Sequence, residues 1–97
     1  MAARITITPE ELRSASTNFA NKAGELREIL NYLRQQVTSL EATWDGAAQD
    51  QFFITFEEMA KTMEQFPEVV DGIGTQLTAV ANTLEQTDEE LASSLRG

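Results

Sequence analysis

The sequence contains neither cysteine nor histidine, and these two absences exclude most kinds of catalytic and metal centre. Without cysteine the chain can form no disulfide and offers no thiol chemistry. Without histidine it has no Ser-His-Asp triad, no zinc site of the usual kind and no di-iron bundle site. Its acidic residues often stand side by side, as in Glu57-Glu58 and Asp88-Glu89-Glu90, so their side chains diverge on a helix. We therefore expect a protein that is not an enzyme and that uses no metal or other cofactor.

Basic residues are also scarce, because the chain has 7 Lys and Arg against 16 Asp and Glu and a net charge of −9. The imbalance lies in the second half of the chain. Residues 1–46 hold five basic and six acidic groups, whereas residues 47–97 hold two and ten. Nucleic acid and anionic membrane surfaces are bound by clustered Lys and Arg. The sequence therefore disfavours both partners, and the acidic half is best explained as a solvated helix face.

Long apolar runs are missing as well. The longest run of large apolar residues is Phe52-Phe53-Ile54, which is far too short to span a membrane. The segment from Met1 to Thr8 holds one Arg and two isolated Ile residues, and it lacks the apolar run of a signal peptide. We therefore expect neither stable membrane insertion nor export through a cleavable signal peptide.

Proline occurs only twice, and the first proline marks the start of a helix. Thr8 suits the N-cap position, Pro9 the first helical position and Glu11 the partner position of a capping box. A stripe then recurs at steps of four and three residues, which is the heptad pattern of a helix packed along one side. Its members, of which only the second is polar, are Leu12, Ser16, Phe19, Ala23, Leu26, Leu30, Leu33, Val37, Leu40 and Trp44.

A second stripe follows the turn-forming residues Asp45 and Gly46. Its members are Phe52, Phe56, Met59, Met63, Phe66, Val70, Ile73, Leu77, Val80, Leu84, Thr87 and Leu91. Pro67 lies inside this stripe without shifting its register, so we expect one continuous helix that bends where the bond to the Met63 carbonyl is lost. The fold predicted is all-α, an antiparallel two-helix hairpin. It forms a single domain over 1–97, with helix one about 9–42, a turn at 43–47 and helix two about 48–93.

A hairpin of two helices leaves much of its apolar surface uncovered. Beside the second stripe runs a row at seven-residue spacing, and most of its members are small: Phe53, Ala60, Pro67, Gly74 and Ala81. Ile29 and Tyr32 add apolar surface on helix one. One interpretation is that these small residues only fill an exposed flank. The other is that the row is a dimer face, on which two hairpins pack into a four-helix bundle.

Two motifs give the chain a resemblance to a known family. Trp44-Asp45-Gly46 lies between the two heptad helices of a chain of 97 residues. This arrangement resembles the WXG family, the small substrates of type VII (ESX-like) secretion related to the early secreted antigenic target. Leu84, Asp88, Leu91 and Leu95 match a C-terminal spacing found in that family. The Tyr-x-x-x-Asp/Glu export signal is absent, because the only tyrosine is Tyr32, and the pattern is similar to the Firmicutes-type members, which are commonly homodimers.

The resemblance implies a function in protein–protein interaction. The chain would be a secreted substrate, effector or co-substrate, found outside a Gram-positive bacterium or on its surface. Its implied partners are a second copy of itself and the type VII secretion ATPase, and a larger co-secreted protein is a further candidate partner. The residues implied are Trp44, Asp45 and Gly46 as the turn motif and Leu84, Asp88, Leu91 and Leu95 as the export motif. The alternative is a cytoplasmic helical adaptor or chaperone that escorts a larger secreted toxin, and a membrane-active effector is a more distant possibility.

Overall fold

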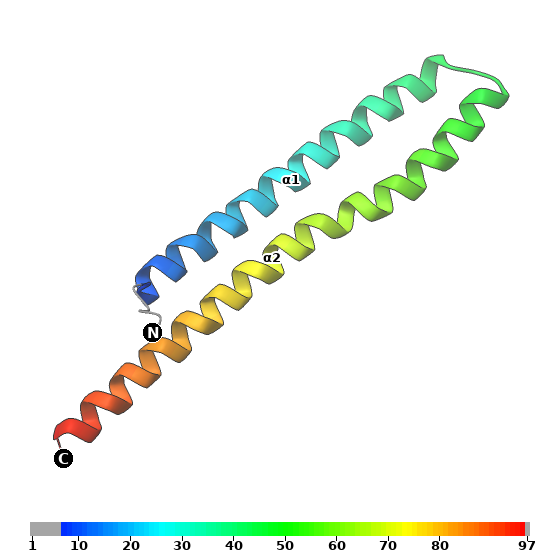
Figure 1. The fold of residues 1–97 in the computed structure, drawn as a ribbon. Helices are drawn as coiled ribbons and strands as arrows, with labels where there is room; N and C mark the ends of the chain where they lie inside the picture. The colour runs from blue at the N-terminus through cyan, green and yellow to red at the C-terminus, as the bar shows by residue number, and fades with distance from the viewer. Residues whose placement is uncertain (1–6, 97) are drawn as a thin grey trace.

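The computed structural model describes residues 7–96, which form two α-helices joined by a short turn. Helix α1 spans Pro9–Thr43 and helix α2 spans Ala47–Arg96. The helices run antiparallel, so the molecule is a rod of 78 × 24 × 20 Å (Figure 1). The predicted all-α hairpin is therefore confirmed. The domain expected over 1–97 includes residues 1–6 and 97, which lie outside the described part of the chain.

The start of α1 follows from its first residues. Thr8 has an extended backbone (φ −104°, ψ 157°), and its side-chain oxygen accepts a hydrogen bond from the Glu11 amide at 3.1 Å. This bond satisfies one of the amides that a helix start leaves without a partner. Pro9 occupies the first turn, where its missing amide costs nothing. The helix ends at Thr43, one residue later than expected, because Trp44 adopts an extended backbone.

Gly46 determines where α2 begins. Its φ is +115°, a value that residues with a Cβ rarely adopt. Its carbonyl accepts hydrogen bonds from the amides of Gln49 at 3.1 Å and Asp50 at 3.3 Å, so the chain enters the helix directly at Ala47. The Gln49 side chain then donates to the Glu41 carbonyl at 3.2 Å, which links the first turn of α2 to the last turns of α1.

Helix α2 is continuous through Pro67, as the unbroken register predicted. Pro67 is fully buried in the seam between the helices, and this burial offsets part of the cost of the missing hydrogen bond. The helix ends at Arg96, three residues beyond the expected limit. Its last turns therefore project past the start of α1 (Figure 1).

The seam between the helices is narrow because its central residues are small. Ala23 of α1 and Ala60, Gly74 and Ala81 of α2 are all buried. A Cβ added to Gly74 would lie 3.2 Å from the carbonyl oxygen of Ser16, so the two backbones come close together at this level. The Ser16 hydroxyl donates to the Gly74 carbonyl at 2.7 Å. This bond accounts for the polar member of the first stripe.

Candidate interaction site

The row expected to form a dimer face packs instead against helix α1 of the same chain. Ala60 and Ala81 are 2% and 0% exposed, Pro67 and Gly74 are buried, and Phe53 is half-buried. The row therefore lies in the seam of the hairpin, which argues against its assignment as a dimer face. The physical reason is that small residues allow the closest approach of two helices, and the nearest helix is the other arm of the hairpin.

Alternate large residues of the second stripe are exposed instead. Every seventh residue of α2 along this row is 39–60% exposed: Phe52, Met59, Phe66, Ile73 and Val80. On α1, Ile29 and Leu33 are exposed as well. We call these seven residues the apolar flank. Singly exposed apolar residues are ordinary, but a continuous row of them along a rod marks a surface that another molecule covers.

A shallow groove runs along the apolar flank between the helices. Its apolar lining comes from Phe19, Leu26 and Ile29 on α1 and from Phe66 and Val70 on α2, and the polar residues Asn18, Lys22 and Glu25 of α1 lie at its edge. A second hollow shares Leu26, Ile29 and Phe66 and continues the groove to Leu33 and Met63. The lining is almost entirely apolar in both hollows. Such a groove suits the side chains of another amphipathic helix better than a polar ligand.

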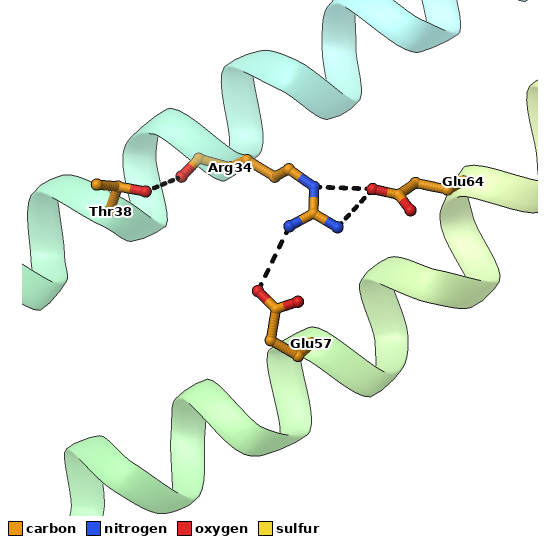
Figure 2. Close-up of polar contacts among 4 residues, drawn as sticks. All are labelled: Arg34, Thr38, Glu57 and Glu64. Atoms are coloured by element: carbon orange, nitrogen blue, oxygen red, sulfur yellow. Dashed lines mark hydrogen bonds and ion pairs between the residues drawn. The ribbon is translucent and has the colours of Figure 1, made fainter.

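The opposite side of the hairpin carries ion pairs, and we call it the charged flank. Arg13 pairs with Glu85, and its guanidinium donates to the Asn82 side chain at 2.7 Å. Arg27 pairs with Asp71 at 2.6 Å. Arg34 reaches across from α1 to both Glu57 and Glu64 on α2 (Figure 2). These pairs are exposed and contribute little individually to stability, but they favour one rotation of each helix about its axis.

Arg34 is the most strongly engaged of these arginines. Its Nε donates to the Glu64 carboxylate at 2.9 Å, and the guanidinium lies 6.0 Å from the centre of the Phe56 ring. The hydrogen bonding to Glu64 raises the pKa of Arg34 above its ordinary value. Because a raised pKa favours the charged form of a base, the guanidinium stays charged at neutral and moderately alkaline pH.

The turn end of the hairpin is an aromatic cluster built around Trp44. The Trp44 ring lies 5.3 Å from the ring of Phe52 and 6.0 Å from that of Phe53, and Phe52 in turn stacks on Phe56 at 6.4 Å. Trp44 is nevertheless 36% exposed. Asp45 is exposed, and Gly46 supplies the positive φ described above. The W-x-G motif thus forms the turn and also presents an aromatic surface at the tip.

The four residues of the C-terminal motif lie on the projecting end of α2. Leu84 is half-buried, Asp88 is exposed, and Leu91 and Leu95 are 60% and 80% exposed. Within one chain this end is at the opposite pole of the rod from Trp44 (Figure 1). The structure therefore does not bring the two motifs together within a single hairpin.

Among residues 7–96, no group of three or more acidic side chains gathers closely enough to hold a metal ion. Neither described helix is apolar enough over a sufficient length to cross a membrane.

The family model WXG100, described as proteins of 100 residues with WXG, matches residues 4–89. This chain belongs to the WXG100 family. An ESAT-6-like protein of Streptococcus agalactiae is 36% identical over 98% of this WXG100 chain and 99% of that protein. The type VII secretion system extracellular protein A of Staphylococcus aureus is 27% identical over 95% of each chain. The crystal structure of a secreted protein EsxB from Bacillus anthracis matches with a TM-score of 0.77 and 39% identity, covering 90% of this chain and 99% of that one.

Sequence reasoning missed the charged flank of this WXG100 chain, although the sequence contains a signal for it. Arg13, Arg27 and Arg34 are separated by multiples of seven residues, as are Glu57, Glu64, Asp71 and Glu85. Two rows of opposite charge at heptad spacing indicate which sides of two helices meet. If the basic row of α1 is placed opposite the acidic row of α2, the large apolar residues of α2 fall on the other side of the seam. That placement predicts the apolar flank as the exposed face.

Proposed function

We propose that this chain is a substrate of a type VII secretion system and acts through protein–protein contacts. The observation that carries the proposal is the WXG100 match over residues 4–89, with the W-x-G motif at the turn of a two-helix hairpin. The similarity to an extracellular protein of a type VII system in Staphylococcus aureus supports the same role. Export would deliver the protein outside a Gram-positive cell, and no catalytic step is part of this function.

The exposed apolar flank supports a homodimer as the exported form. Covering Phe66, Ile73 and Val80 with the same row of a second copy removes apolar side chains from water on both chains. The result is a four-helix bundle in which the small residues lie inside each hairpin and the large residues lie between hairpins. The charged flanks then face solvent, where the net negative charge keeps the dimer soluble.

A composite export signal follows from an antiparallel arrangement of this dimer. The turn of one chain would lie beside the projecting α2 end of the other, so Trp44 and Gly46 would stand near Asp88, Leu91 and Leu95 of the second copy. The exposure of Trp44, Leu91 and Leu95 supports this proposal, because side chains left uncovered at one end of a rod are available to a receptor. The proposed receptor is the ATPase of the secretion system.

Secretion is tested by comparing culture supernatant with cell lysate, in a strain that carries the translocation ATPase and in one that lacks it. A cytoplasmic marker protein controls for lysis. We expect the chain in the supernatant of the first strain only. Equal release from both strains would contradict transport by this system.

The alternative function is an adaptor or chaperone that stays in the cytoplasm and escorts a larger secreted protein. The apolar groove between Ile29 and Phe66 favours this function, because the groove would accept an amphipathic helix of another protein. This function predicts retention in the lysate and co-purification with one larger protein in equal amounts. The leading function predicts export and a partner of the chain's own mass.

A further inference from the structure

The middle of the hairpin brings together residues that weaken helices. Pro67, Gly72 and Gly74 lie within about two turns of α2. Gly24 lies on α1 one turn before Arg27, whose guanidinium contacts the Asp71 carboxylate at 2.6 Å. Because Asp71 directly precedes Gly72, Gly24 and Gly72 are at the same level of the rod.

Gly24 and Gly72 have no local requirement for glycine. A Cβ added at either position would meet nothing within 4 Å, and neither residue has a positive φ. They differ in this respect from Gly46, which needs its φ of +115°, and from Gly74, which contacts the backbone of α1. Glycine loses more backbone freedom than alanine when it enters a helix, so both positions lower helix stability without a compensating contact.

The hydrogen-bond ladder of α2 is also interrupted at this level. Pro67 has no amide to donate to the carbonyl of Met63. Gly72 follows little more than one turn later. The contacts between α2 and α1 here include those of Gly74 with Ser16 and Phe19, the bond of the Ser16 hydroxyl to the Gly74 carbonyl and the Arg27–Asp71 ion pair, and Ala23 and Pro67 are buried in the seam.

We infer that residues 67–74 of α2 and the turn of α1 around Gly24 form a compliant waist, at which the hairpin bends and opens locally while its two halves stay packed. Bending at this level changes the direction of the turn end relative to the projecting end of α2. This bending is a property of the hairpin itself and does not depend on the proposed export.

Amide hydrogen exchange followed by mass spectrometry tests the waist on the full-length protein in its native oligomeric state. We expect amides of residues 68–75 and 22–28 to exchange about tenfold faster than those of residues 55–64 and 33–40. Gly72→Ala should slow exchange in the waist about fivefold, as expected for replacing a helical glycine by alanine. Exchange in residues 55–64 should stay unchanged.

The matched control is Ala79→Gly, which places a glycine one heptad further along the same exposed row of α2. It should speed exchange around residue 79 and leave the waist as it was. Uniform protection of the wild-type chain from residue 55 to residue 83 would overturn the inference. So would an equal slowing of all amides by Gly72→Ala, because that result would mean that the glycine lowers only the global stability.

Discussion

At the scale of single residues, the W-x-G motif has a conformational basis. Gly46 combines a φ of +115° with a carbonyl that accepts the first hydrogen bonds of α2. Trp44 covers Phe52 and Phe53 and so closes the apolar seam at the tip. Asp45 lies between them and is exposed, so its side chain is free of the packing that Trp44 makes.

Gly46→Ala should lower the free energy of unfolding by about 1–2 kcal/mol, because the Cβ of alanine clashes with the backbone at a positive φ. Urea denaturation followed by circular dichroism measures the effect. The control is Gly24→Ala, which should raise stability by up to about 1 kcal/mol, since Gly24 has open space and an ordinary φ. Equal effects of the two changes would refute the conformational explanation of the motif.

At the scale of the helices, α1 and α2 fit together through a central row of small residues between a charged and an apolar flank. The close contact of Gly74 with Ser16 leaves no room for a larger side chain at position 74. The ion pairs of Arg13, Arg27 and Arg34 lie to one side of the row. The hairpin therefore has two chemically different sides, and only the apolar flank is suited to packing against a further helix.

Ala60→Leu should destabilise the hairpin by about 1–3 kcal/mol, because the added volume must push α1 and α2 apart. Thermal unfolding monitored by circular dichroism checks this expectation. Gln35→Leu, at an exposed position of α1, serves as the control and should change stability by no more than a few tenths of a kcal/mol. A variant of Ala60 that keeps its stability but loses its dimer would instead return the small row to the interface between chains.

The two helices and their turn were predictable from local signals in the sequence. Thr8 and Pro9 identify the start of α1, and the unbroken stripe through Pro67 identifies one long second helix. The face that packs inside the hairpin was not predicted correctly. A heptad helix has neighbouring apolar rows, and periodicity within one helix does not reveal which row its partner contacts. That choice depends on matching across helices, as between Arg27 and Asp71.

At the scale of the whole molecule, the exposed row of large residues predicts a dimer. Light scattering at micromolar concentration should give about twice the chain mass of 10.8 kDa. Ile73→Ser should weaken the dimer at least tenfold, because it removes a large apolar side chain from the middle of the apolar flank. Ile54→Ser is the matched control, because Ile54 is also exposed but lies on the side of the charged flank. Residue 54 is four heptads before Asn82, which contacts Arg13 on that flank. A stable, fully helical monomer of the wild-type chain would disprove the dimer.

Removal of residues 92–97 should abolish secretion while leaving the dimer folded, because most of the seam lies upstream of this segment. Trp44→Ala should also block secretion, and the loss of its aromatic contacts should lower stability by a few kcal/mol. Helical content by circular dichroism must accompany both export assays to separate unfolding from loss of the signal. Efficient export of a folded chain that lacks both Trp44 and the tail would contradict an export signal composed of these two motifs.

The overhang of α2 beyond the start of α1 has a thermodynamic consequence for whatever it binds. A helix segment that packs against no neighbour has little stability in water, because its own hydrogen bonds barely offset the loss of backbone entropy. Within residues 7–96, α1 does not extend beside the last turns of α2, so we expect these turns to fray more readily than the rest of the helix, and a receptor that recognises them as a helix would bind a frayed chain more weakly. A second chain that packs against the overhang raises the helical population. Assembly and recognition are then linked equilibria, and a lone hairpin is a weaker ligand than a paired one.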